Sequence, residues 1–125
     1  MYTVTVETSF TASHQLRLGD GTFEPLHNHN WQIRAAVTAQ NLDRLGLAID
    51  FNKLMHLLDS ILAPMKDKKL ETLVPFQNQH QNTSAELVAK YIFDSLKPLL
   101  PPQTALAYIE VMEAPNCWAK YSQCD

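Results

Sequence analysis

Two stretches of the chain carry apolar residues at the three-and-four spacing of an amphipathic helix, and helix signals bound both. The first covers 51–62, with Asp50 as the expected N-cap and a following proline as its stop. The second covers 87–96 and follows a capping box in which Thr83 is the expected cap, and Pro98 ends it. These two helices leave the rest of the chain to strands and loops.

Segments that favour strands lie on both sides of the helices. Residues 2–13 and 30–39 alternate in polarity, and residues 106–112 and 118–121 are rich in strand formers. The order strand, strand, helix, helix, strand, strand predicts an α+β fold, with an antiparallel four-stranded sheet and two helices on one face. The polar segment 66–81 between the helices is expected to be irregular.

Length and composition limit the class of protein. The 125 residues suit a single domain, 1–125, with its own core. A hydrophobic fraction of 46% and a net charge of −3 are ordinary for a globular protein and give no basic surface for nucleic acid. No apolar stretch suits a membrane helix and the N-terminus lacks a signal-peptide pattern, which predicts no membrane contact and a cytoplasmic location. Cys117 and Cys124 form no Cys-x-x-Cys pair and are expected to be free thiols.

Three histidines are spaced so that they can converge on one metal ion. His27 and His29 are two residues apart, so on a strand their side chains point the same way. His14 lies near the end of the segment expected to form the neighbouring strand. Three protein nitrogens leave one position of a tetrahedral zinc ion open, as in catalytic zinc sites. The alternative is three strand histidines that make ordinary hydrogen bonds.

Five short motifs follow one another along nearly the whole chain. They are Phe10–His14, Leu26–Trp31, Ile49–Phe51, Thr83–Ser84 and Glu113–Pro115. Together with the order of strands and helices they resemble the 6-pyruvoyl-tetrahydropterin synthase family, which includes 6-carboxytetrahydropterin synthase. The resemblance implies a tunnelling fold, in which protomers join their sheets into a barrel, with active sites at protomer interfaces. A homo-oligomer, trimer or hexamer, is therefore expected.

The resemblance also implies roles for individual residues. The substrate would be a dihydropterin such as 7,8-dihydroneopterin triphosphate, whose side chain is oriented by zinc. A carboxylate near the C-terminus would anchor the pterin ring through a bidentate pair with its 2-amino and N3 hydrogens. The matching positions are His14, His27 and His29 as zinc ligands, Glu113 as the ring anchor, and Thr83 and Ser84 in the pocket wall.

Two departures from the family pattern bear on catalysis. The cysteine that usually serves as base is missing from 17–26, while Glu24 stands three residues before the second zinc histidine. This looks like the variant subfamily in which glutamate replaces cysteine and the product resembles 6-hydroxymethyl-7,8-dihydropterin. A carboxylate beside zinc can act as a general base. The Asp-His pair of the family's proton relay has become Lys66-Asp67, so either Asp67 or a histidine such as His80 substitutes, or that activity is lost.

The sequence and the resemblance together predict a zinc-dependent lyase acting on 7,8-dihydroneopterin triphosphate or a related dihydropterin. Side-chain cleavage toward 6-hydroxymethyl-7,8-dihydropterin ranks above formation of 6-pyruvoyl- or 6-carboxytetrahydropterin, because the cysteine is missing. Two alternatives stay open: a pterin- or purine-binding module that keeps zinc but has lost its relay, and an oligomeric structural protein with an empty site. On the plainer reading, Glu24 is a solvated loop residue and Asp67 belongs to a solvated charge run, 66–69.

Overall fold

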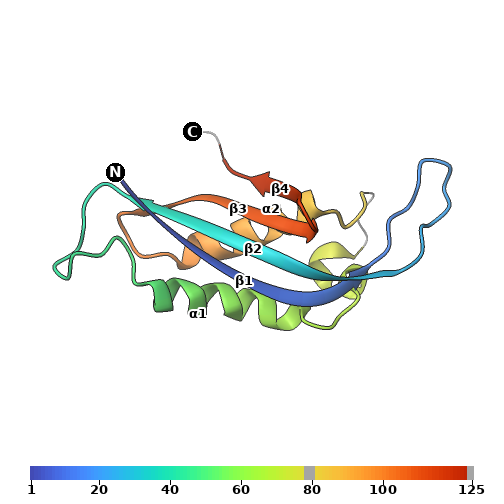
Figure 1. Cartoon of the computed structure of the whole chain (residues 1–125), viewed down its shortest axis with the longest axis horizontal. Helices are drawn as coiled ribbons and strands as arrows, with labels where there is room; N and C mark the ends of the chain where they lie inside the picture. Colours follow the sequence, from blue (N-terminus) through green and yellow to red (C-terminus); the bar gives the residue numbers. More distant parts are fainter. Residues whose placement is uncertain (78–80, 124–125) are drawn as a thin grey trace.

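The computed structural model describes residues 1–77 and 81–123 (Figure 1). Its main elements are β1 (Tyr2–His14), β2 (His27–Ala39), α1 (Phe51–Leu62), α2 (Ala85–Leu96), β3 (Thr104–Ala114) and β4 (Cys117–Tyr121). Short 3-10 helices follow the α-helices: η1 (Ala63–Met65), η2 (Leu70–Thr72), η3 (Val74–Phe76) and η4 (Lys97–Leu99). The predicted order of strands and α-helices is confirmed.

The four strands form one antiparallel sheet in the order β1-β2-β3-β4. Both α-helices lie on the same face of this sheet (Figure 1), with α1 against β1 and α2 against β3 and β4. On β2 the side chains of Trp31 and Ile33 are fully buried on this face, while the alternate residues Gln32 and Arg34 are only partly buried. The predicted α+β layer arrangement is therefore confirmed.

The core lies between the sheet and the two helices. Its fully buried large side chains include Trp31, Ile33, Leu54, Leu58, Ile92 and Phe93. Burying an aliphatic or phenyl side chain of this size contributes about 1.5–3 kcal/mol relative to leaving it exposed. The indole Nε1 of Trp31 donates to the carbonyl of Ala12 at 3.1 Å, so its polar atom is satisfied inside the core. The Trp31 ring is therefore held in place near the end of the β1–β2 pair.

Strand β2 begins at His27, earlier than the alternating pattern from Asn30 predicts. The register explains the difference, because His14 lies opposite His27 and Ala12 lies opposite His29. The polar run at the start of β2 has no alternation of its own, and its pairing with the end of β1 keeps it extended. Two histidines of β2 are thereby placed beside the last residue of β1.

The N-terminal caps of the helices agree with the sequence in one case and differ in the other. The Asp50 side chain accepts from the backbone N–H groups of the first turn of α1, as predicted. The cap of α2 is Ser84, whose hydroxyl accepts from the N–H of Leu87 at 3.2 Å, so the prediction of Thr83 is wrong by one residue. Serine is as good a cap as threonine, and α2 starts only at Ala85. Within 1–77 and 81–123, no helix is long and apolar enough to span a bilayer.

Candidate metal centre and catalytic site

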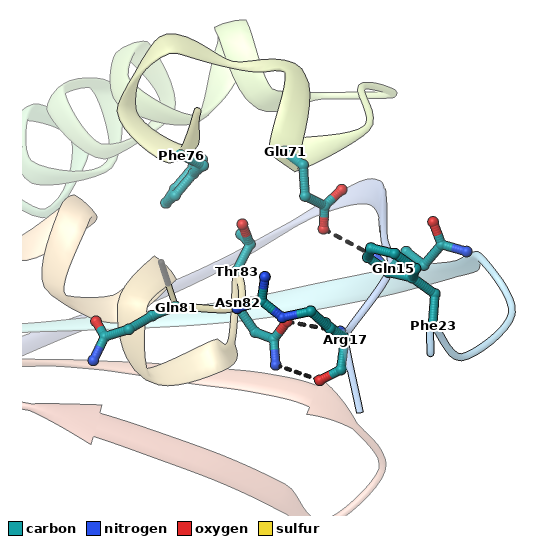
Figure 2. Close-up of a pocket in the computed structure, with 8 residues that line it drawn as sticks. All are labelled: Gln15, Arg17, Phe23, Glu71, Phe76, Gln81, Asn82 and Thr83. Atoms are coloured by element: carbon teal, nitrogen blue, oxygen red, sulfur yellow. Dashed lines mark hydrogen bonds between the residues drawn. The ribbon is translucent and has the colours of Figure 1, made fainter. Parts of the chain in front are cut away.

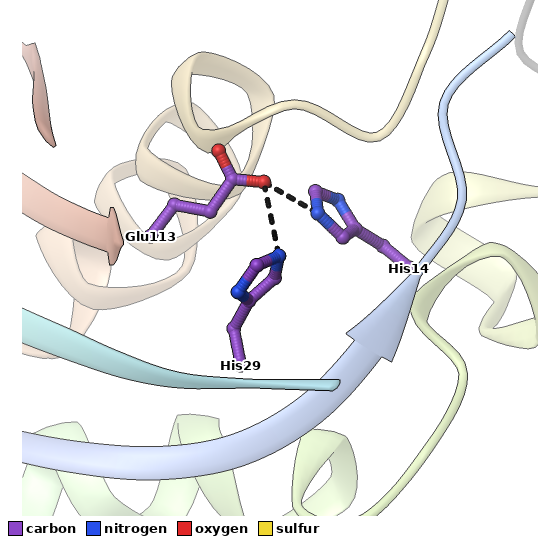
Figure 3. A group of neighbouring side chains, drawn as sticks. All are labelled: His14, His29 and Glu113. Atoms are coloured by element: carbon purple, nitrogen blue, oxygen red, sulfur yellow. Dashed lines mark ion pairs between the residues drawn. The ribbon is translucent and has the colours of Figure 1, made fainter. Parts of the chain in front are cut away.

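Three side chains from three different strands meet at one end of the sheet: His14 of β1, His29 of β2 and Glu113 of β3 (Figure 3). Each offers one ligand atom, and these atoms all lie within 4.8 Å of one another. One Glu113 oxygen, Oε1, contacts Nε2 of His14 directly and lies 3.8 Å from Nε2 of His29. We call these three residues the His–Glu cluster.

The strands explain why these residues converge. His29 lies on the same face of β2 as the buried Trp31, and its ring meets the Trp31 ring edge-on with centroids 5.8 Å apart. Glu113 sits where the pairing of β3 with β4 shifts between Met112 and Ala114. Such a bulge re-aims a side chain relative to the regular strand. The cluster is thus a product of sheet register rather than of a loop.

His14 is held in one orientation by the backbone of a distant segment. Its Nδ1 lies 2.9 Å from the carbonyl oxygen of Thr83, and a carbonyl can only accept, so Nδ1 carries the proton. In the neutral form of the ring, Nε2 then presents a lone pair toward the other cluster residues. The side chain is only 1% exposed, and Nε2 has no hydrogen-bond partner among the described residues, although the Glu113 carboxylate lies against it. A buried lone pair without a hydrogen bond is costly unless something else uses it.

His29 is biased toward its neutral form. Burial is the main cause that holds the pKa of His29 below its ordinary value, followed by the nearby His14 ring, whereas the carboxylate of Glu113 acts in the opposite direction. Metals bind the neutral imidazole, and zinc takes imidazole nitrogens and carboxylate oxygens as ligands. The residues of the His–Glu cluster therefore fit a divalent metal such as zinc.

His27 lies outside the His–Glu cluster. Its ring stacks on that of His29 at 8° with centroids 5.6 Å apart, and its side chain is 42% exposed. Its Nε2 lies 3.8 Å from Oε1 of Glu24. The structure thus brings together two of the three predicted zinc histidines with Glu113. His27 is not part of this group and stacks on the ring of His29.

Glu24 lies on the segment 15–26 that connects β1 and β2. Its N–H donates to the carbonyl of Leu16 at 3.0 Å, and its Oε1 accepts from the N–H of Leu16 at 3.3 Å. With the contact to His27, these bonds place the carboxylate beside the histidine pair of β2. A carboxylate can act as a general base when a substrate proton comes within hydrogen-bond reach, so Glu24 is a candidate for this role.

The remaining predicted residues lie around the site at different distances. Asp67 is exposed, has a positive φ of 59°, and donates its backbone N–H to the carbonyl of Thr11 at 2.6 Å. It is not part of the His–Glu cluster. Thr83 is buried beside His14, and Ser84 caps α2. His80 lies outside the described residues.

Two residues near the site carry no signal in the sequence. The carboxylate of Glu71 accepts from the N–H of Gln15 at 2.9 Å, and the side-chain amide of Asn82 pairs with the backbone of Arg17. Both line a cavity of about 190 Å³, together with Gln15 and Thr83 (Figure 2). Each contact joins residues more than 50 positions apart in the chain, so no local spacing could have revealed it.

Comparison with known proteins gives consistent results. The model of the family described as 6-pyruvoyl tetrahydropterin synthase matches residues 3–124. A 6-carboxy-5,6,7,8-tetrahydropterin synthase from Haemophilus influenzae is 24% identical over 143 aligned positions, covering 98% of this chain and 100% of the relative. The solved 6-pyruvoyl tetrahydropterin synthase of Caenorhabditis elegans superposes with a TM-score of 0.78 at 23% identity, covering 99% and 98% of the two chains. A catalytic residue mutant of the Plasmodium vivax enzyme, with glutamate changed to alanine, gives a TM-score of 0.78 at 18% identity and the same coverage.

The sheet and its two helices define an α+β protein of the tunnelling fold, and the His–Glu cluster is a candidate metal site at the end of the sheet. Because the family model matches nearly the whole chain, the chain belongs to the 6-pyruvoyl tetrahydropterin synthase family. The resemblance stated from the motifs is confirmed. The named relatives are tetrahydropterin synthases.

Proposed function

We propose that this chain is a zinc-dependent lyase acting on 7,8-dihydroneopterin triphosphate or a related dihydropterin. The reaction is cleavage of the side chain toward 6-hydroxymethyl-7,8-dihydropterin, with formation of 6-pyruvoyl- or 6-carboxytetrahydropterin ranked second. The observation that carries the proposal is a carboxylate, Glu24, beside the histidine pair next to the His–Glu cluster, in a member of this family. We expect this enzyme to work in the cytoplasm.

The metal would be held by His14 and His29 together with a third ligand. The family resemblance favours His27 as this ligand, whereas the described geometry favours Glu113. Bound zinc supplies Lewis-acid polarisation of the substrate's side-chain oxygens. The Thr83 carbonyl keeps the Nε2 lone pair of His14 turned toward the cluster, as backbone carbonyls do for many metal-binding histidines.

Glu24 is the candidate base in this proposal. In an aldol-type cleavage its carboxylate removes the proton of a side-chain hydroxyl, and the electron pair of that O–H bond forms the new carbonyl as the carbon–carbon bond breaks. The pterin-bearing carbon receives that bond's electron pair and is protonated in turn. The similar Plasmodium vivax protein has a glutamate as a catalytic residue, which supports a carboxylate in this role. Leu16 fixes the carboxylate through its N–H.

Glu113 has two candidate roles, and its position near the two histidines makes them alternatives. As a ring anchor it would accept from the 2-amino and N3 hydrogens of the pterin in a bidentate pair. As a metal ligand it would complete the His–Glu cluster. Thr83 and Ser84 remain candidates for the wall of the pterin pocket in either case, since they lie between His14 and the start of α2.

Product analysis tests the proposal. Zinc-loaded protein is incubated with 7,8-dihydroneopterin triphosphate, and the pterins are identified by mass spectrometry beside a homologue of known activity. We expect 6-hydroxymethyl-7,8-dihydropterin as the main product. Recovery of unchanged substrate, when the homologue turns it over, contradicts the proposal.

A second candidate is a pterin-binding module that has lost turnover. Asp67 favours this candidate, because its side chain is exposed and is not part of the His–Glu cluster. Within the described residues, Asp67 therefore does not replace the Asp-His pair of the family's proton relay. Calorimetry with a dihydropterin, combined with long incubation, separates the two candidates. Binding without product supports the module, and product above background eliminates it.

A further inference from the structure

We propose that Asn82 is a positioning residue for Glu24. It acts by holding the connecting segment 15–26 to the segment that also orients His14. This inference rests on the proposed role of Glu24 as base, and it adds a residue outside the matched motifs to the working site.

The side-chain amide of Asn82 binds both backbone groups of one residue on the opposite segment. Arg17 donates its N–H to Oδ1 of Asn82 at 2.7 Å, and Nδ2 of Asn82 donates to the Arg17 carbonyl at 2.9 Å (Figure 2). This two-point contact resembles the exchange of bonds between paired strands. Because both ends of the amide are engaged, the contact fixes the orientation of the Arg17 backbone as well as its distance.

The Arg17 backbone is linked to Glu24 through a short ladder. Arg17 forms an antiparallel bridge with Phe23, and Leu16 exchanges bonds with Glu24, one through the backbone carbonyl and one through the carboxylate. The side-chain amide Nε2 of Gln15 donates to the backbone carbonyl of Glu24 at 2.9 Å. A shift of Arg17 therefore moves the residue that carries the candidate base.

Apolar burial does little to hold this segment in place. Three of its four leucine and phenylalanine residues, Leu18, Phe23 and Leu26, are 47%, 62% and 54% exposed, and the fourth, Leu16, is only partly buried. A surface loop with few buried contacts opens locally at low cost, so its geometry depends on its hydrogen bonds. A further tether joins the segment to η2, where the carboxylate of Glu71 accepts from the backbone N–H of Gln15 at 2.9 Å.

The neighbour of Asn82 connects the same segment to the metal side of the site. Thr83 accepts from Nδ1 of His14 through its carbonyl. The two neighbouring residues Asn82 and Thr83 therefore fix the loop that carries Glu24 and the ring of His14 relative to each other. Holding the two parts in fixed relation is what converts nearby groups into a productive site, and a displacement of about 1 Å can cost about 100-fold in rate.

A double-mutant cycle tests the inference with a readout that a purely structural role would not move. Asn82→Ala is expected to lower kcat about 10- to 100-fold with little change in KM or zinc content. In a Glu24→Ala background the same change should lower the remaining turnover less than about twofold, because the base it positions is gone. Asn82→Asp keeps the acceptor for the Arg17 N–H and should fall between Asn82→Ala and the wild type. Asn52→Ala, on the exposed face of α1, is the matched control.

Hydrogen exchange decides the inference even if the proposed function fails. Asn82→Ala should raise the exchange rates of the Leu16, Arg17 and Glu24 amides at least about tenfold, while Asn52→Ala leaves them unchanged. Wild-type protein without turnover would refute the proposed function alone. Unchanged exchange at these amides, or an equal loss of kcat with and without Glu24, would overturn the role of Asn82.

Discussion

Glu24 and His29 contact different parts of the same site. The Glu24 carboxylate lies 3.8 Å from Nε2 of His27, the outer histidine, whereas Nε2 of His29 faces the Glu113 carboxylate. Removing Glu24 therefore leaves the inner pair of His14 and His29 and their partners in place. This arrangement lets the chemical step be separated from metal binding by single substitutions.

Replacement of Glu24 by alanine is expected to lower kcat by a factor of about 10² to 10⁴, the usual contribution of a general base. Zinc content should stay at the wild-type level, since His14 and His29 are unchanged. Glu24→Gln keeps the size of the side chain and an acceptor for the Leu16 N–H, so it serves as the matched variant. Steady-state kinetics and metal analysis measure both effects. Undiminished turnover in either variant would remove Glu24 from the mechanism.

Zinc affinity should fall as the pH is lowered, because only neutral imidazole binds the metal. Burial lowers the pKa of His29, so this ring stays neutral below the ordinary histidine value of about 6.5. For His29 the loss of zinc affinity should therefore begin below that value and grow as the pH falls further. Competition with a chelator between pH 7.5 and pH 5 measures it, with His29→Ala as the comparison. An affinity that stays constant over this range would contradict metal binding by these histidines.

Two neighbouring residues at the start of α2 have different roles: one contacts the site and the other stabilises the helix. Thr83 binds His14 through its carbonyl, and the next residue, Ser84, caps the helix through its hydroxyl. The N-cap bond satisfies one of the free N–H groups of the first turn. The two neighbouring residues therefore have different roles that separate substitutions can distinguish.

Ser84→Ala is expected to lower the free energy of unfolding by about 1 kcal/mol through loss of the cap. Thr83→Val, which keeps the buried volume and the backbone carbonyl, should leave the cap intact. Denaturant unfolding of the substrate-free protein measures both changes. A larger loss of stability from Thr83→Val with none from Ser84→Ala would restore Thr83 as the cap.

The elements that depend on local patterns could be predicted from the sequence. Three-and-four spacing located both helices. Alternation located β1 and most of β2, although it missed the polar start of β2, and the content of strand-forming residues located β3 and β4. Residues joined only by long-range contacts could not be predicted, because their meeting depends on sheet register and loop path. Asn82 and Arg17 are 65 positions apart, and the approach of Glu113 to His14 depends on the shift in β3–β4 pairing.

At the scale of the whole molecule, the sheet has two edges. Strands β1 and β4 are its outer strands, and within the described residues the outer edge of β1 is bridged only near its end, at Ser13 and Lys69. Open strand edges are sites at which another chain can add to a sheet. These edges are consistent with the barrel of protomers that the family resemblance implies.

Light scattering after size-exclusion chromatography should give the mass of a trimer or a hexamer, three or six times 14.2 kDa. Association of this kind pairs the free backbone groups of the edge strands. Measurement across a range of protein concentrations separates a stable assembly from weak association. A monomer at all concentrations would contradict the expected homo-oligomer.

We propose that the end of this sheet is a zinc centre built on His14 and His29. Anomalous diffraction at the zinc absorption edge, from crystals of zinc-loaded protein, would locate the ion. We predict one anomalous peak per chain at about 2.0–2.1 Å from Nε2 of both histidines, with His27 or Glu113 identified as the third ligand by its distance. The absence of a peak within bonding distance of both histidines in zinc-loaded crystals would rule out this zinc centre.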